Sequence, residues 1–294
     1  MRDQGGATAA STGRRPPSGG YAARIDVELL YRQHLSETDR QLLRAVSPPD
    51  TPVVTAFGSP GLEAAVFGGE GAGPGATVSP FLAFAVAVHR TAAALEKTTF
   101  VEERVGAHQR IPVFDVAALR AMLRDPLRRY FFVELLASYT RVSSGVTWRR
   151  TARGWRRQRF SELDPARLAA LLDTVGPRER PGVYRRLGDL CLFLLGVFPD
   201  HPPLPAGAAA DRLRSHSGVQ VEQAADLDGV ALFELLGSAW YRNATRLVTA
   251  TGQPVTGTLA VVGEVADHFR EARRVLNAVT DRYLFPLRSR WFPA

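Results

Sequence analysis

Residues 146–160 constrain the fold more than any other stretch of this 294-residue chain, and they read VTWRRTARGWRRQRF. β-Branched and aromatic residues alternate with polar ones on both sides of an Arg-Gly pair, which is typical of two short strands joined by a turn. Six arginines fall within the stretch, and they occupy both faces of such a ribbon. Because charged groups are costly to bury unpaired, we predict a β-hairpin that keeps at least one face in water.

The positive charge of the protein is concentrated in this hairpin. The formal net charge is +8, and Lys97 is the only lysine. Between Arg141 and Arg159 there are seven arginines and no acidic residue, so this segment alone accounts for +7. The remainder of the chain is close to neutral, and an anionic partner should therefore be attracted mainly to the hairpin.

The hairpin also carries two tryptophans among its arginines. In an antiparallel pair with an even-length loop, Trp148 lies on the same face as Trp155 and Arg157. Guanidinium groups contact phosphates bidentately and indoles stack on unpaired bases, so we predict a polyanion as the partner, with nucleic acid as the first candidate. The candidate binding residues are Trp148, Arg149, Arg150, Arg153, Trp155, Arg156, Arg157 and Arg159.

Two other interpretations of the hairpin stay open. An adaptor or oligomer subunit would use Trp148, Trp155 and the C-terminal Trp291 and Phe292 as apolar anchors for a protein partner, which could be acidic. A purely structural hairpin would instead stack its tryptophans on arginines or pair the arginines with acids elsewhere in the fold.

Most of the remaining chain has the apolar periodicity of helices. A Pro-bounded β-branched run at 51–57 is a candidate short strand, and the Gly-rich stretch 68–75 a loop. We therefore expect a mainly α fold, a multi-helix bundle-like domain with one arginine-rich β-hairpin. The predicted helices cover about 25–46, 78–105, 113–122, 127–142, 164–175, 181–197, 232–248 and 259–283.

Changes of composition suggest where the chain divides. Residues 1–24 are small and polar and are expected to form a disordered tail. A helical domain over 25–200, which includes the hairpin at 146–160, is followed by a proline-rich connection at 201–218. The C-terminal helices of 219–294 are expected to pack on the main domain.

Asp189 is an acidic residue inside the apolar run LGDLCLFLLGVF. A carboxylate in such a helix is costly unless it is paired, and Arg185 and Arg186 precede it by four and three residues. We expect a structural ion pair, while a small-molecule-binding helical domain with a pocket near Asp189 is the further alternative. Gly188 and Gly196 on the same helix would allow close helix packing.

No pattern in the sequence specifies an active site. The six histidines are scattered, and neither HExxH nor GxSxG occurs. Cys191, the single cysteine, lies in an apolar helix, which excludes an intrachain disulfide and a multi-cysteine metal site. We predict a non-enzymatic protein with no catalytic residue, metal or cofactor, although catalysis assembled from distant residues stays open.

Two observations bear on location. The longest apolar run, 187–198, contains Asp189 and is too short to span a bilayer, and the N-terminus lacks the apolar core of a secretory signal. The runs SELDPARLAALLDTV, RPGVYRRLGDLCLFLLGVFPDH and HFREARRVLNAVTDRYLFPLRSRWF resemble a family of uncharacterised proteins from actinomycetes, over most of the chain from about Tyr130 onward. The resemblance implies a cytoplasmic bacterial protein and adds no catalytic residue, while the short apolar runs predict that the protein has no membrane partner.

Overall fold

The computed structural model describes residues 25–68, 78–104, 109–151, 154–199, 207–219, 227, 229–252 and 257–286. Over these residues the fold is mainly α, with two antiparallel two-stranded hairpins. The predictions of a tail at 1–24 and of most of the loop at 68–75 lie outside the described residues.

The N-terminal half consists of short helices and a small hairpin. Its helices are α1 (Val27–His34), α2 (Glu37–Val46), α3 (Val53–Ala56), α4 (Pro60–Phe67), α5 (Pro80–Leu95), α6 (Val116–Arg124) and α7 (Pro126–Ser138). Strands β1 (Val101–Arg104) and β2 (Arg110–Val113) pair between α5 and α6.

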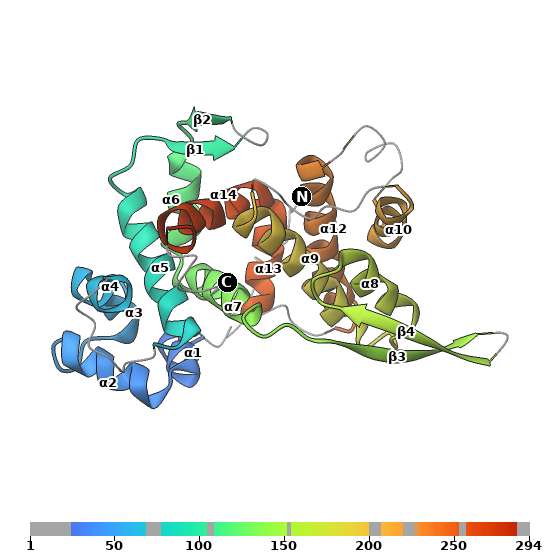
Figure 1. Cartoon of the computed structure of the whole chain (residues 1–294), viewed down its shortest axis with the longest axis horizontal. Helices are drawn as coiled ribbons and strands as arrows, with labels where there is room; N and C mark the ends of the chain where they lie inside the picture. Colours follow the sequence, from blue (N-terminus) through green and yellow to red (C-terminus); the bar gives the residue numbers. More distant parts are fainter. Residues whose placement is uncertain are drawn as a thin grey trace, which may run out of the picture.

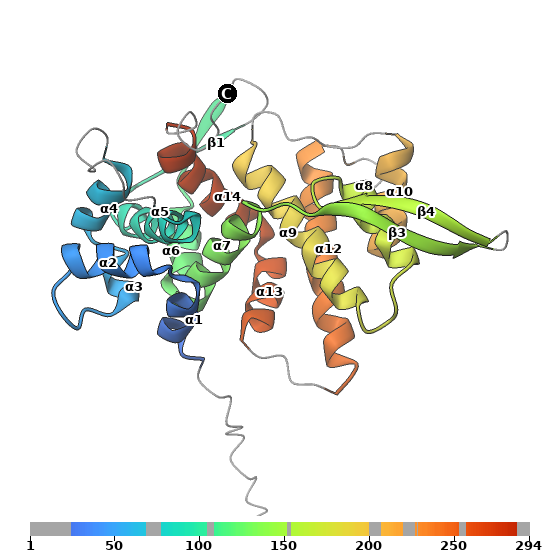
Figure 2. The ribbon, with the colours of Figure 1, turned by 60° about the horizontal axis from the view of Figure 1, so that its bottom comes forward.

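The C-terminal half begins with the long hairpin, formed by β3 (Ser144–Thr151) and β4 (Gly154–Ser161). It continues with α8 (Pro165–Ala169), a 3₁₀ turn η1 (Ala170–Asp173), α9 (Arg180–Val197), α10 (Ala208–Ser217), α12 (Gly229–Thr249), α13 (Thr258–Asp267), α14 (Phe269–Val279) and a π turn η2 (Thr280–Leu284). Helices α1 to α4 lie at one end of the molecule, and the β3–β4 hairpin projects from the other (Figures 1 and 2).

Helix α9 is central to the C-terminal half. A Cβ atom on Gly188 would lie 2.4 Å from the ring of Tyr241 on α12, and one on Gly196 would lie 2.5 Å from Cβ of Leu276 on α14. Both glycines therefore let a neighbouring helix approach α9 more closely than a larger residue would, as the sequence predicts. Leu187, Leu190 and Cys191 of the same helix are fully buried.

The stretch 25–46 forms two helices instead of the single helix predicted, because α2 starts with its own cap. The Ser36 hydroxyl accepts a hydrogen bond from the amide of Asp39 (3.1 Å), and the Asp39 carboxylate accepts one from the amide of Ser36 (2.8 Å). This reciprocal pair is a capping box, in which the first residue is extended and so ends the preceding helix. Leu35 and Ser36 both have extended backbones.

The strand predicted at 51–57 is wrong, since the β-branched run forms the short helix α3. Its first amides donate hydrogen bonds to the carboxylate of Glu28 on α1, at 2.8 Å from Val53 and 3.2 Å from Val54. A carboxylate at a helix N-terminus satisfies amides that have no partner inside the helix. A contact between two distant segments thus overrides the local β-propensity.

The helix predicted over 78–105 is too long, because α5 ends at Leu95 and β1 follows. The guanidinium of Arg120 on α6 donates hydrogen bonds to the carbonyls of Leu95 and Thr98, both at 2.8 Å. These bonds hold the turn that follows α5 against α6, since the carbonyls at the end of a helix can accept bonds from outside it. The helix predicted from 113 accordingly begins later, at Val116, after the second strand of the small hairpin.

The final predicted helix, 259–283, is interrupted at His268, whose backbone (φ −123°, ψ 40°) is not helical and separates α13 from α14. The stretch 201–218, expected as a connection, contains α10 in its described part. The start predicted at Asp164 is confirmed, since its carboxylate accepts a hydrogen bond from the amide of Arg167 (3.0 Å) with Pro165 as the first helical residue. None of the described helices combines the length and the apolar character needed to cross a bilayer.

Candidate nucleic-acid interface

The β3–β4 hairpin distributes its residues between the two faces as the sequence predicts, although Gly154, next to the expected turn, is the first residue of β4 and pairs with Thr151. Trp148 pairs with Arg157, Arg150 with Trp155, and Val146 with Arg159. Cross-strand partners lie on one face of an antiparallel pair, so these six positions share a face. The ribbon extends past the helices in both views (Figures 1 and 2).

The described side chains of this face, which we call the tryptophan face, are open to water. The side chain of Trp148 is 60% exposed and that of Val146 is 39% exposed, and Arg157 and Arg159 are exposed as well. Within the described part of the chain, neither arginine forms an ion pair, and no guanidinium lies over the indole of Trp148. The exposed charge of these arginines is therefore available to a partner.

The other predicted binding residues are placed by their backbone or lie outside the described residues. Arg149 and Arg156 are paired with each other on the opposite face of the ladder, while Arg150 and Trp155 are paired on the tryptophan face. Arg153 lies between the strands and outside the described residues. The structure thus brings seven of the eight predicted positions onto one two-stranded ribbon.

The base of the hairpin is attached to the helical body. The Glu162 carboxylate accepts hydrogen bonds from the amide of Ser143 (2.9 Å) and from the guanidinium of Arg186 on α9 (3.2 Å). That guanidinium also lies 3.9 Å from the ring centroid of Tyr139 and donates to the Ser138 hydroxyl (2.7 Å). The ribbon therefore starts from a fixed point on α7 and α9, so its base has a defined position.

The structure separates the predicted partners of Asp189. Arg185 lies near it, with Nε 3.9 Å from Oδ2, and the hydroxyl of Tyr241 donates a hydrogen bond to Oδ1 at 2.8 Å. Arg186 is instead engaged at the hairpin base. Burial raises the pKa of Asp189 to about 6, even though Arg185 and the Tyr241 hydroxyl lower it.

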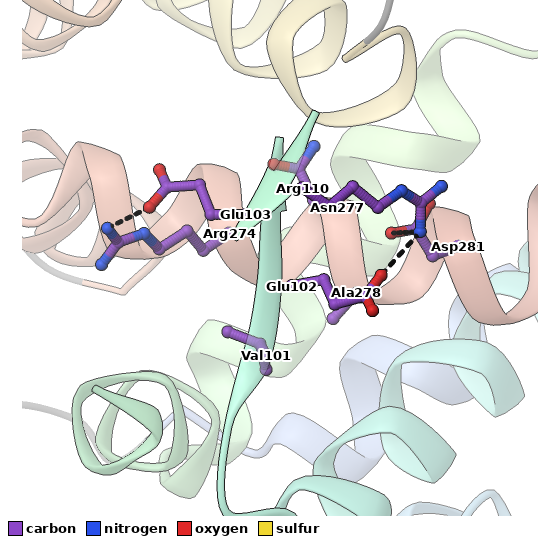
Figure 3. Close-up of a pocket in the computed structure, with 8 residues that line it drawn as sticks. All are labelled: Val101, Glu102, Glu103, Arg110, Arg274, Asn277, Ala278 and Asp281. Atoms are coloured by element: carbon purple, nitrogen blue, oxygen red, sulfur yellow. Dashed lines mark hydrogen bonds and ion pairs between the residues drawn. The ribbon is translucent and has the colours of Figure 1, made fainter. Parts of the chain in front are cut away.

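A second group of charges surrounds a cavity of about 230 Å³ between the β1–β2 hairpin and α14 (Figure 3). Glu103 binds Arg274, and Arg110 lies 3.0 Å from Glu102 and 3.9 Å from Asp281. The charges around this cavity are therefore already paired with one another. The lining residues are Val101, Glu102, Glu103, Arg110, Arg274, Asn277, Ala278 and Asp281.

Arg273 joins this group to the interior, and we call Arg273, Arg274, Glu103 and Glu234 the α14 network. Arg273 is 6% exposed, and it contacts Glu234 on α12 at 2.6 Å and Glu103 on β1. Burial raises the pKa of Glu103, but hydrogen bonds from Arg274 and Arg273 outweigh this and hold it below its ordinary value. Sequence reasoning missed this network, and its signal in the sequence is that Arg270, Arg273 and Arg274 fall between the apolar positions of the helix predicted at 259–283.

The described residues bear on two kinds of active-site component, metal-binding clusters and reactive thiols. No cluster of three or more histidine, cysteine or acidic side chains within them is arranged to hold a metal. Burial raises the pKa of Cys191 well above its ordinary value, so its reactive thiolate is suppressed. The chain matches no family model, no curated protein and no solved structure.

Proposed function

We propose that this protein binds nucleic acid through the β3–β4 hairpin and acts as a non-enzymatic binding or regulatory protein. The observation that carries the proposal is the tryptophan face, where the exposed Trp148, Arg157 and Arg159 lie together on a ribbon that extends past the helical body. No acidic residue interrupts the sequence between Arg141 and Arg159.

The pairing of arginines elsewhere in the molecule supports the proposal. On α7, α9 and α14, Arg128, Arg185 and Arg273 each lie within 3.0 Å of a carboxylate oxygen. Arg157 and Arg159 form no such pair with the described residues, so an anionic partner does not have to displace an acid from them. Phosphates suit this arrangement because a guanidinium can donate two hydrogen bonds to one phosphate.

The salt dependence of binding tests the proposal. Each phosphate neutralised on duplex DNA contributes about −0.9 to the slope of log affinity against log salt, and about −0.7 on a single strand. Arg157→Ala combined with Arg159→Ala should flatten the slope by roughly one to two such contributions. Fluorescence anisotropy with labelled duplex and single-stranded DNA and RNA, at several salt concentrations, measures this slope.

The matched control is Arg40→Ala combined with Arg44→Ala on α2, which removes the same charge from the opposite end of the molecule. Both side chains are exposed, at 44% and 69%, and both already lie near Glu37. The control should keep the wild-type slope. The proposal is contradicted if duplex DNA, single-stranded DNA, duplex RNA and single-stranded RNA all fail to bind in a salt-sensitive way. It is also contradicted if the two double variants change the salt slope equally.

A protein partner is the second candidate, and the exposed apolar area of Trp148 and Val146 favours it. Tryptophan is enriched among the residues that dominate protein interfaces. The C-terminal Trp291 and Phe292, the other predicted anchors, lie outside the described residues. If the protein is an adaptor, the wild type should retain a protein partner in a pull-down and the Trp148→Ala variant should not, and neither should retain nucleic acid. Nucleic acid that co-purifies with the wild type and is released by high salt would favour the first proposal.

A further inference from the structure

The two faces of the hairpin carry different residue types, and this difference suggests whether the ligand is single-stranded or duplex nucleic acid. On the tryptophan face, indole and guanidinium positions alternate, with Trp148 opposite Arg157 and Arg150 opposite Trp155. On the other face, Arg149 is opposite Arg156 and Thr147 is opposite Gln158. The aromatic residue of that second face is Phe160, which lies at the base of the hairpin. Its ring is so close to Gly145 that a Cβ atom added to this glycine would lie 2.9 Å from it.

We infer that the hairpin holds a single-stranded nucleic acid along the tryptophan face, with the indole of Trp148 stacked on an unpaired base. The inference rests on the proposed function and narrows it to one class of ligand. Positions two apart on a strand are separated by about 6.8 Å, so each tryptophan position on this face has an arginine position close to it, across the ladder or along the strand. This alternation suits a nucleotide, which presents a flat base and an anionic phosphate on either side of its sugar.

A duplex would leave the indole without a comparable partner. Within a double helix the flat faces of the bases are stacked on one another, and a protein meets only base edges and phosphates unless it unstacks a step. Arginines alone are sufficient for phosphates. The 60% exposed indole of Trp148 gains contact only where base faces are free, as they are in a single strand.

The experiment compares single-stranded and duplex ligands with full-length protein. The probes are a labelled oligo(dT) of about 16 nucleotides and a labelled duplex of equal length, at the same salt concentration. The wild type should bind oligo(dT) about tenfold or more tightly than the duplex. Trp148→Ala should weaken oligo(dT) binding by about 5- to 150-fold, the range that corresponds to the loss of one stacking contact, and duplex binding by less than about twofold.

Two further variants separate stacking from a general loss of surface. Trp148→Phe keeps a flat ring and should bind oligo(dT) within about threefold of the wild type. Phe114→Ala removes a ring that is 73% exposed at the end of β2, far from the hairpin, and should leave both affinities unchanged. Thermal unfolding of each variant checks that the fold is intact.

The outcomes distinguish the inference from the proposed function. If the wild type binds the duplex as tightly as oligo(dT), or if Trp148→Ala leaves oligo(dT) binding unchanged, the inference is overturned. Salt-sensitive duplex binding that Arg157→Ala and Arg159→Ala weaken would still support the proposed function. If neither these ligands nor the RNA probes of the salt titration bind in a salt-sensitive way, both are overturned.

Discussion

The β3–β4 hairpin and the α14 network are both rich in arginine, but they hold it in opposite environments. In the network, Arg273 is 6% exposed and lies between Glu103 and Glu234. On the hairpin, Arg157 and Arg159 are exposed and have no acidic partner among the described residues. The number of arginines therefore says little about function; what matters is whether a carboxylate lies within reach of each one.

The two environments imply different physical roles. A buried guanidinium is tolerated because its pairs compensate for the water it has lost, and removing it takes a charged partner away from carboxylates that stay buried. An exposed guanidinium keeps its hydration and contributes little to stability, but its charge can attract a ligand. We expect stability to depend on the first group and binding on the second.

The largest effect on stability should come from Arg273→Ala. This change removes the partner that Glu103 and Glu234 share and leaves them only Arg274 and Arg270, which should lower the free energy of unfolding by about 1.5–3 kcal/mol. Arg242→Ala is the control, since its pair with Asp267 (3.1 Å) is 56% and 66% exposed and should change the free energy by less than about 1 kcal/mol. Urea unfolding measures both, and similar losses for the two variants would contradict the comparison.

The pH dependence of stability should reveal the buried charge of Asp189. Its pKa is about 6 in the folded protein and 3.8 ordinarily, so between these values the folded state keeps a proton that the unfolded chain has released. The free energy of unfolding should therefore fall as pH rises through this window, by up to about 1.4 kcal/mol per pH unit. Above pH 6 this contribution should become constant.

Asp189→Asn cannot titrate and should lack this component, which urea unfolding at several pH values would show. The difference between the wild type and the variant should change between about pH 4 and 6, while Arg157→Ala with Arg159→Ala should follow the wild-type curve. Parallel curves for the wild type and Asp189→Asn would show that Asp189 titrates normally.

The smallest effect on stability should come from the hairpin arginines. Because Arg157 and Arg159 are exposed and lack described ion pairs, their joint replacement by alanine should change the free energy of unfolding by no more than about 0.5 kcal/mol per residue. The same variant should flatten the salt slope of binding. A loss of several kcal/mol would mean that the arginines stabilise the fold, and would favour the structural interpretation of the hairpin.

The parts of the fold that sequence predicts correctly are those with local signals. The cap of Asp164 followed by Pro165, the helix through Leu187 to Val197, and the alternation that forms the β3–β4 hairpin are each encoded within a few residues. The close packing allowed by Gly188 and Gly196 is predictable for the same reason. The sequence pattern also identifies the positions of the tryptophan face, because the side-chain period of a strand is two.

Apart from the local capping box at Ser36, which divides the helix predicted at 25–46, the parts that sequence reasoning misses depend on distant partners. Helix α3 replaces the predicted strand where the Glu28 carboxylate accepts bonds from its first amides, and α5 ends at Leu95, whose carbonyl accepts a bond from Arg120. Arg273 and Glu103, which pair in the α14 network, are 170 residues apart in the sequence. Nothing near either residue indicates the other, so the exposure of an arginine follows only from the tertiary structure.

The pairing of β3 with β4 leaves each strand with an outer edge that pairs with no other described strand. Such edges carry unpaired backbone groups that can recruit a second copy of the chain and begin aggregation, and charged side chains are a common means of preventing it. Arg149 and Arg150 on β3 and Arg156, Arg157 and Arg159 on β4 give both edges a positive charge, which disfavours the edge-to-edge pairing of two copies. The positive charge of the ribbon therefore also disfavours intermolecular pairing of its edge strands.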